Sequence, residues 1–132
     1  MSNAIRSGEP YRIIVTGSRH YRRGHPIMVA IADAVTTDEA ITRPITIITG
    51  GAAGADSIAT RFAGAAGYSV QQYTADWATH GRSAGPKRNQ LMVDAGADIC
   101  LAFPIGDSQG TRDCMRRCVA AGIPVKEYPS NG

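Results

Sequence analysis

The chain has 132 residues, of which 43% are hydrophobic and 6% aromatic, and its formal net charge is +3. This length accommodates one compact domain with its own core and leaves no room for a second domain. Abundant alanine and glycine favour helices packed closely on a sheet over an aromatic-rich β-sandwich. The mild positive charge suits phosphate-bearing ligands, but it is too small to indicate nucleic-acid binding by itself.

No apolar run approaches the roughly 18 residues of a membrane span, and residues 1–10 lack the apolar stretch of a secretory signal. We therefore expect a cytoplasmic protein with no membrane partner. Residues 1–10 are expected to form an N-terminal tail, in which Ser2-Asn3-Ala4 resembles the remnant of an expression tag. Residues 11–128 would form the folded domain and residues 129–132 a C-terminal tail.

The first half of the chain predicts two strands, each followed by a helix. Residues 11–16 form an apolar strand that Gly17-Ser18-Arg19 closes, and a basic segment leads to a helix starting at Pro26. Helical spacing places four of its residues on the core face: Met28, Ile31, Ala32 and Val35. Residues 45–48 form a β-branched strand, and the helix that follows it runs to Ala66.

The turn between residues 45–48 and the second helix has the composition of an anion site. It reads Gly50-Gly51-Ala52-Ala53-Gly54, with Asp56 opening the helix. Glycines ahead of a helix expose backbone N–H groups at the positive end of the helix dipole. Two alternatives remain open: the glycines serve only a tight turn, and Asp56 caps the helix rather than binding a ribose hydroxyl.

The second half predicts a strand at residues 68–73, whose polar content favours a sheet edge, and an irregular loop at residues 75–86. In that loop Trp77 either stacks on a flat ligand or anchors the loop to the core. A helix over residues 87–95 carries Arg88 in its first turn. A cation there opposes the helix dipole, so a ligand or a buried acid explains it better than chance.

Residues 98–103 form a fourth strand, and residues 104–111 form the next glycine-marked strand end before a helix. We expect one stripe of that helix to face the core, made of Met115, Cys118, Val119 and Gly122. A short last strand begins near Val125.

The chain has three cysteines, and an odd number does not indicate a framework of disulfide bonds. Cys100 lies in an apolar run, where a buried free thiol is ordinary. Cys114 and Cys118 are one helical turn apart and have the spacing to share a metal ion, but no second His or Cys pair accompanies them. We therefore expect reduced thiols and no metal site.

Strands that alternate with helices predict an α/β fold, a single Rossmann-like three-layer domain with about five parallel strands in the order 3-2-1-4-5. In such sheets ligands bind at the carboxyl ends of the strands, near the point where strand order reverses. The turns at residues 17–19, 50–54 and 106–111 all fall on that edge. We expect them to line one cleft for a phosphate-type ligand.

Several of these segments together resemble a known family, the YspA-like branch of the SLOG superfamily, which occurs in bacteria and phages. The resemblance spans almost the whole chain and rests on Val15-Thr16-Gly17-Ser18-Arg19, Gly50 to Asp56, Trp77 with His80-Gly81, Gly85-Pro86-Lys87-Arg88-Asn89 with Met92, and Phe103-Pro104 with Gly110-Thr111-Arg112-Asp113. It implies binding of a nucleotide or nucleotide-derived ligand. The implied ligand-binding residues are Gly17, Ser18, Arg19, Gly50, Gly51, Ala52, Ala53, Gly54, Asp56, Trp77, Arg88, Asn89, Pro104, Gly106, Gly110 and Thr111.

Two relatives of this family extend the expectation in different directions. The LONELY GUY phosphoribohydrolases cleave the N-glycosidic bond of nucleoside monophosphates with an Arg and a Glu. Arg88 matches their arginine, but their Pro-Gly-Gly-x-Gly-Thr-x-x-Glu motif would put the glutamate at Cys114, so the catalytic candidates are Arg88 and Asp113. This departure leaves open whether the chain is an enzyme.

The second relative is DprA, a single-stranded DNA binder, whose glycine turn and Arg-Asn-Arg helix are similar to Gly51 to Asp56 and Arg88-Asn89. Arg19, Arg22, Arg23, Trp77 and Arg82 are too scattered to indicate a stacking groove, so DNA binding ranks below a small nucleotide ligand. The relatives also imply a homodimer, which an Ala- and Gly-rich helix surface permits without requiring it.

Overall fold

The computed structural model describes residues 8–129, and its centre is one sheet of five parallel strands in the order β3-β2-β1-β4-β5. The strands are β1 (Tyr11–Gly17), β2 (Ile45–Thr49), β3 (Ser69–Gln72), β4 (Ile99–Phe103) and β5 (Val125–Glu127). The predicted α/β class, parallel sheet and strand order are confirmed. The polar strand β3 does lie at an edge.

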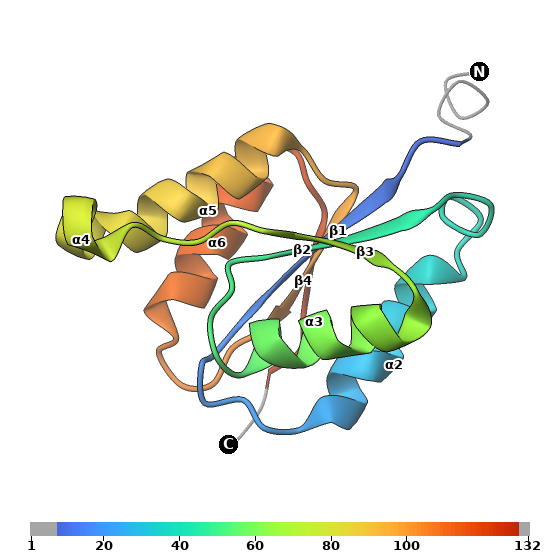
Figure 1. The fold of residues 1–132 in the computed structure, drawn as a ribbon, viewed down its shortest axis with the longest axis horizontal. Coiled ribbons are helices and arrows are strands. Elements are labelled where there is room, and N and C mark those ends of the chain that lie inside the picture. Colours follow the sequence, from blue (N-terminus) through green and yellow to red (C-terminus); the bar gives the residue numbers. More distant parts are fainter. Residues whose placement is uncertain (1–7, 130–132) are drawn as a thin grey trace.

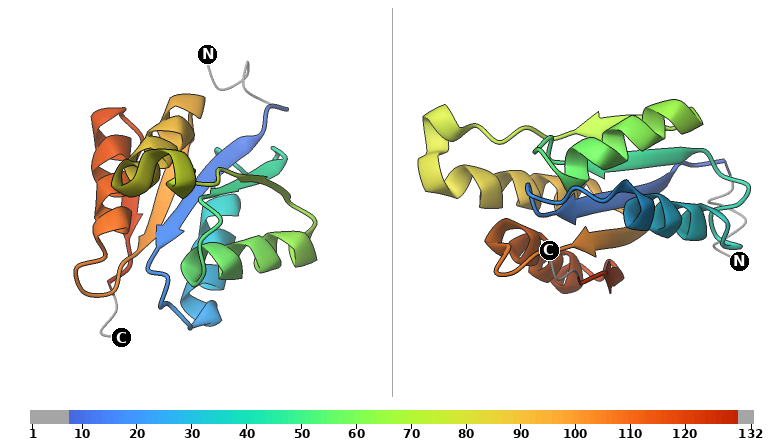
Figure 2. Two further views of the ribbon diagram at one scale, coloured as in Figure 1. Left: turned by 60° about the vertical axis from the view of Figure 1, so that its left-hand side comes forward. Right: turned by 90° about the horizontal axis from the view of Figure 1, so that it is seen from below.

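Helices cover both faces of the sheet and complete three layers (Figures 1 and 2). α2 (Gly24–Val35) and α3 (Ala55–Ala66) lie on one face, and α5 (Ala84–Ala95) and α6 (Gln109–Ala120) lie on the other. Within the part of the chain that the structure describes, no helix has the length and apolar character needed to cross a membrane.

Side chains that alternate along the central strands contribute to two core layers, one on each face of the sheet. Ile13 and Val15 of β1 pack with the layer of α2 and α3, whereas Ile14 between them packs with the layer of α5 and α6. Successive side chains of a strand point to opposite faces, and both faces here are covered. This is why β2 and β4 are apolar or β-branched throughout and fully buried.

Two predicted helix faces are wrong by about one position. In α2 the buried residues are Ile27, Ala30, Ile31 and Ala34, while Met28 is 44% exposed. In α6 they are Thr111, Cys114 and Cys118, while Val119 is 66% exposed. Both helices carry apolar residues on more than one side, so the sequence periodicity does not define a single face.

The segment predicted as an irregular loop at residues 75–86 is mostly helical. It contains α4 (Trp77–His80) and the 3₁₀ turn η1 (Gly81–Ser83), and α5 begins at Ala84, three residues before the predicted start. Asp76 begins α4 by accepting a hydrogen bond from the Thr79 N–H (3.2 Å). Pro86 fits inside the first turn of α5 because its missing N–H would have had no partner there.

The segments that follow two neighbouring strands, β1 and β4, run to opposite faces of the sheet. β1 and β4 are neighbours in the sheet, with Gly17 opposite Phe103, but β1 continues into α2 on one face and β4 into α6 on the other. Ligands of open α/β sheets bind at such a point, beyond the carboxyl ends of the strands. The three glycine-marked turns all begin at this edge.

Candidate functional site

The turn at Gly17–Arg19 packs directly against the start of α3. The Ser18 N–H donates to the Phe103 carbonyl (3.0 Å), and the Ala55 N–H donates to the Ser18 carbonyl (3.2 Å). A Cβ placed on Gly17 would lie 2.6 Å from the Ala55 Cβ, and one on Gly54 would overlap the Ser18 carbonyl. These two glycines are therefore required by close backbone contact, independently of any ligand.

The Gly50–Gly54 turn encloses the carboxylate of Asp56. The Asp56 Oδ2 accepts hydrogen bonds from the Gly50 N–H (2.9 Å) and the Ala52 N–H (3.3 Å), and the residue is 5% exposed. Burial raises the pKa of Asp56 to about 6, although these hydrogen bonds and the charge of Arg88 oppose the rise. Asp56 thus binds the turn before the helix rather than capping the helix end.

Part of this anion-binding turn is still open. Asp56 occupies the Gly50 and Ala52 donors, and the Gly51 N–H lies 3.3 Å from its Thr49 Oγ1 acceptor. Among the described residues, none accepts a hydrogen bond from the N–H of Ala53 or Gly54, and both precede the N-terminus of α3. These two donors at the positive end of a helix dipole remain available to an external anion.

Arg88 joins α5 to this turn. Its Nη1 donates to the Gly50 carbonyl (2.7 Å) and lies 3.5 Å from the Tyr73 carbonyl, so it holds the ends of β2 and β3. A Cβ on Gly50 would overlap the guanidinium. The predicted role of this first-turn cation is thus partly structural, and Arg88 also brings a positive charge to the carboxyl edge.

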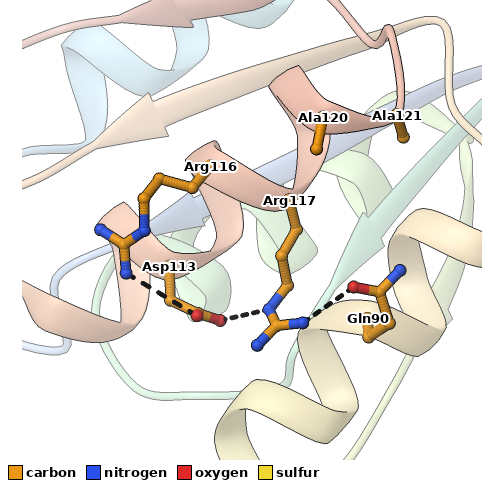
Figure 3. A pocket seen from close by; sticks show the side chains of 6 residues that line it. All are labelled: Gln90, Asp113, Arg116, Arg117, Ala120 and Ala121. Atoms are coloured by element: carbon orange, nitrogen blue, oxygen red, sulfur yellow. Dashed lines mark hydrogen bonds and ion pairs between the residues drawn. The ribbon is translucent and has the colours of Figure 1, made fainter.

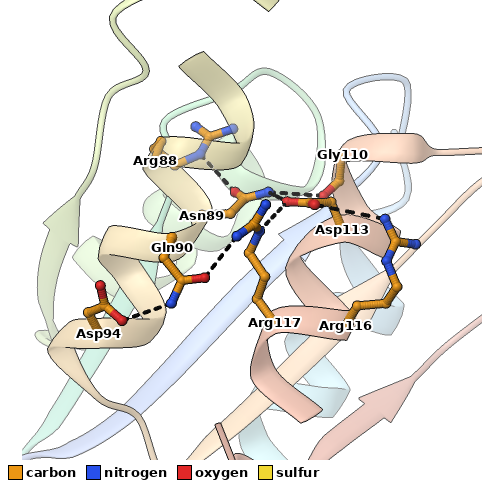
Figure 4. A network of polar contacts seen from close by, with 8 residues as sticks. All are labelled: Arg88, Asn89, Gln90, Asp94, Gly110, Asp113, Arg116 and Arg117. Atoms are coloured by element: carbon orange, nitrogen blue, oxygen red, sulfur yellow. Dashed lines mark hydrogen bonds and ion pairs between the residues drawn. The ribbon is translucent and has the colours of Figure 1, made fainter. Parts of the chain in front are cut away.

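Asn89, the next residue, reaches the turn after β4. Its Nδ2 donates to the Gly110 carbonyl (3.2 Å) and to the Asp113 Oδ2 (3.0 Å), while its Oδ1 accepts from the Arg88 Nε (2.9 Å). Figure 4 shows this chain of contacts from α5 to α6. Asn89 is 3% exposed, and every polar atom of its side chain has a partner, which makes it a positioning residue at the junction.

The carboxylate of Asp113 is hydrogen-bonded to, or ion-paired with, three neighbouring side chains. Besides Asn89, it accepts from the Arg117 Nε (2.8 Å) and pairs with Arg116 (3.8 Å). Burial would raise the pKa of Asp113, but the hydrogen bonds from Arg117 and Asn89 and the charges of Arg117 and Arg116 hold it below its ordinary value. A carboxylate held ionised in this way is a poor proton donor.

Cys114 points elsewhere, although it is next to Asp113 in the sequence. It is fully buried against the sheet, in the core layer that also holds Ile14 and Cys100. The position at which the phosphoribohydrolases carry a glutamate is therefore in the core of this chain.

The turn at Gly106–Thr111 begins α6 without a side-chain cap on the helix N–H groups. Ser108 has a φ of 42°, and its hydroxyl hydrogen-bonds the Thr111 hydroxyl (2.8 Å). Arg112 reaches back to the carbonyls of Gly106 (3.1 Å) and Asp107 (3.0 Å). Arg112 thus holds the turn in place, while the N–H groups at the start of α6 point out of the helix.

Trp77 takes no part in the contacts described above between the glycine-marked turns and α5. It lies on α4, which projects beyond the sheet in Figure 1, and it is 58% exposed with one edge of its ring against the Gly85 position. The alternative that Trp77 anchors a loop to the core is wrong. Arg19 is also exposed, and Pro104 is buried.

A shallow open depression lies away from the glycine turns, between α5 and α6 (Figure 3). It is lined by Gln90, Asp113, Arg116, Arg117, Ala120 and Ala121. Its arginines already face Asp113 and Gln90, since the Arg117 Nη1 donates to the Gln90 Oε1 (2.8 Å).

The contacts connect the predicted site residues in two groups. Gly17, Ser18 and Gly54 meet at the start of α3, and Arg88 with Asn89 bridges from Gly50 to Gly110. Their roles as ligand-binding residues, and those of Arg88 and Asp113 in catalysis, remain predictions.

One cluster was missed from the sequence. The expectation of no metal site rested on the missing partner of Cys114 and Cys118, but the structure brings Cys100 of β4 to them. The signal was available in the strand: Cys100 alternates with Leu101, so it faces the layer of α6.

Comparisons with known proteins find a family profile, a phage protein and a solved structure that are similar to this chain. A sequence profile of the YspA, cpYpsA-related SLOG family matches residues 11–80. The chain is 44% identical over 122 residues to the Gene 61 protein of Mycobacterium phage D29, covering 89% of this chain and 95% of that protein. A solved structure, the C-terminal domain of a hydrogenase from Pyrococcus furiosus, aligns over 92% of this chain and 94% of that chain with 14% identity and a TM-score of 0.45. That last similarity is too low to carry an argument.

The family match covers β1 to α4 and includes the turns at Gly17–Arg19 and Gly50–Gly54. The phage relative extends the similarity over nearly the whole length of both proteins. On these grounds the chain belongs to the YspA, cpYpsA-related SLOG family.

Proposed function

We propose that the protein binds a nucleotide or nucleotide-derived ligand, with the ligand's anionic group at the carboxyl edge between β1 and β4. The observation that carries the proposal is the position of Arg88. Its guanidinium lies 2.7 Å from the Gly50 carbonyl, beside the turn that opens α3, and its neighbour Asn89 holds the turn that opens α6. One cation and the N-termini of α3 and α6 thereby lie at the same edge of the sheet, where each favours a negative charge.

The free donors of the glycine turn support an anionic group in particular. The N–H groups of Ala53 and Gly54 have no acceptor among the described residues. The adjacent donors of the same turn already bind a carboxylate, that of Asp56, so this backbone conformation stabilises negative charge. A phosphate oxygen that accepts a hydrogen bond from the Ala53 N–H would be bound by the same turn as the Asp56 carboxylate.

The geometry gives less support to hydrolysis of an N-glycosidic bond. That reaction needs a group that manages protons next to the developing positive charge of the sugar. Asp113 is held ionised by Asn89, Arg116 and Arg117, and Cys114 is buried. Binding is therefore the function that we propose, and base release becomes one outcome of its test.

The test begins with mass spectrometry of small molecules that co-purify with the protein. Nucleoside monophosphates, the candidate found in this way and inorganic phosphate are then titrated calorimetrically into the wild type, Arg88→Ala, Arg88→Lys and Arg61→Ala. Arg61 is an exposed arginine of α3, so its variant controls for the loss of one positive charge. We expect Arg88→Ala to weaken binding by roughly 10- to 100-fold, since a charge-assisted hydrogen bond contributes about 1.5–3 kcal/mol.

Three outcomes would contradict the proposal. Absence of binding by every nucleotide tested and of any co-purifying nucleotide removes it. Base released from a monophosphate, and abolished in Arg88→Ala, replaces it with the hydrolase alternative. Binding of single-stranded DNA that is tighter than nucleotide binding and falls steeply with salt replaces it with the DNA alternative.

A further inference from the structure

Three cysteine sulfurs meet in the core between the sheet and α6. Cys100 comes from β4 and Cys114 and Cys118 from α6, and their Sγ atoms all lie within 4.8 Å of one another. All three residues are fully buried. This cluster is independent of the glycine turns and of the nucleotide proposal.

The fold itself produces this convergence. Cys114 and Cys118 are four residues apart, which puts both side chains on the face of α6 that covers the sheet. Cys100 points from β4 into the same layer, together with Ile14 of β1 and Ile48 of β2. Two sulfurs from a helix and one from a strand thus face one another in the same core layer.

The three Sγ atoms are close enough together for one ion to contact all of them. Binding of that ion would ionise the thiols. A thiolate is the form of cysteine that binds metal ions.

The spacing of the sulfurs suits a common metal ligand set. With metal–sulfur bonds of about 2.3 Å, three sulfurs in a plane around one ion lie about 4 Å apart. A small inward movement of side chains, from separations of at most 4.8 Å, completes that arrangement.

The number and kind of donors select the ion. Structural zinc sites use four ligands, whereas the group of His, Cys, Asp and Glu side chains that meets here, among the described residues, has three members, all cysteine. Three thiolate sulfurs suit monovalent copper, which prefers soft sulfur ligands. We propose that Cys100, Cys114 and Cys118 form a three-coordinate site for Cu(I).

The proposed binding is a coordination step without electron transfer. The ion enters and stays as Cu(I), metal–sulfur bonds replace the S–H bonds of thiols that ionise, and their protons pass to solvent. Because the sulfurs are fully buried, uptake requires local opening of α6, and we expect it to be slower than mixing.

The experiment uses the reduced full chain under anaerobic conditions, with Cu(I) supplied from a coloured chelator complex. We expect one Cu(I) per chain, X-ray absorption that reports three sulfur neighbours, and protection of all three thiols from alkylation. Cys100→Ala and Cys118→Ala should each weaken binding by at least roughly tenfold, because loss of a ligand costs no less than loss of a supporting contact. Ile123→Val, a buried change in the same core cluster that removes no donor atom, should leave the affinity unchanged.

Circular dichroism verifies that each variant is folded, and the absorption and alkylation measurements need only the wild type. The proposal fails if the folded wild type binds no Cu(I), if the metal has other than three sulfur neighbours, or if Ile123→Val rather than a cysteine variant abolishes binding. Tighter binding of Zn(II) than of Cu(I) in a matched competition would also overturn it.

Discussion

The Asp56 carboxylate and the Gly50 N–H, six residues apart, are joined by a 2.9 Å hydrogen bond inside the turn between β2 and α3. The chain thereby places its own negative charge in a turn built to bind one. A buried carboxylate of this kind couples the stability of the fold to pH.

The first prediction concerns this coupling. The pKa of Asp56 is about 6 in the folded protein against an ordinary value of 3.8, so the folded state binds the proton more tightly. The resulting stabilisation is fully present below about pH 4 and is lost as pH rises through about 6. Its size is up to about 3 kcal/mol, given 1.36 kcal/mol per pH unit of displacement.

Urea unfolding of the wild type and of Asp56→Asn between about pH 4 and pH 7 measures this contribution. Asparagine does not titrate, so the free energy of unfolding of the wild type should fall relative to that of the variant as pH rises. A difference that is independent of pH, or that increases with pH, would show that the folded pKa of Asp56 is not raised.

The second prediction concerns Gly17. A Cβ there would lie 2.6 Å from the Ala55 Cβ and 2.8 Å from the Phe103 carbonyl. Gly17→Ala should therefore destabilise the protein by about 1–3 kcal/mol or more, because backbone and core must move apart. Thermal and urea unfolding measure the change.

Gly64→Ala is the matched control for Gly17→Ala. Gly64 lies inside α3 and a Cβ on it meets nothing within 4 Å, so alanine should stabilise the helix by about 0.5–1 kcal/mol. Equal effects of the two substitutions would contradict the close contact between the turn and α3.

The third prediction concerns Asn89. Asn89→Asp replaces the Nδ2 donor with an oxygen that faces the Asp113 carboxylate at the former 3.0 Å contact. We expect a loss of about 3 kcal/mol at neutral pH, because a buried charge is added beside a like charge. Part of the loss should be recovered in acid, where a protonated carboxyl donates to Asp113 again.

Gln90→Glu provides the comparison for Asn89→Asp. It also adds a negative charge to α5, at a half-buried position where the Oε1 accepts from Arg117 and where only an exposed hydrogen bond, from the Nε2 to Asp94 (2.8 Å), is lost. Its effect on the free energy of unfolding should stay within about 0.5 kcal/mol. Similar losses in both variants would mean that charge on α5, rather than the contact with Asp113, is responsible.

The fourth prediction separates the structural role of Arg88 from its proposed role in binding. Without any ligand, Arg88→Ala should destabilise the fold by about 1.5–3 kcal/mol, because the Gly50 carbonyl loses a charged donor at 2.7 Å. Arg61→Ala should be nearly neutral. An Arg88→Ala protein as stable as the wild type would show that this contact contributes nothing to stability.

The sheet could be predicted from the sequence because its signals are local and strong. Residues 45–48 are β-branched throughout and residues 99–103 are an uninterrupted apolar run. Each is followed by glycines and a helix, which requires parallel strands and puts the turns on one edge. Which side of α2 and of α6 faces the core could not be predicted, since Met28 and Val119 are apolar but face solvent.

The candidate site was predictable only in its outline. The sequence indicates which turns lie at the carboxyl edge, but not that Asp56 occupies the donors of Gly50 and Ala52, because several geometries place an acid at a helix start. The same limit applies to Cys100, whose partners are 14 and 18 residues away on another element and approach it only when α6 packs on β4.

Arg88 and Asn89 are consecutive residues of one helix, and they hold carbonyls in two different turns, those of Gly50 and Gly110. A shift of α5 along its axis therefore pulls on both turns at once. One helix therefore sets the spacing between the two turns, and a substitution that displaces α5 changes both sides of the carboxyl edge together.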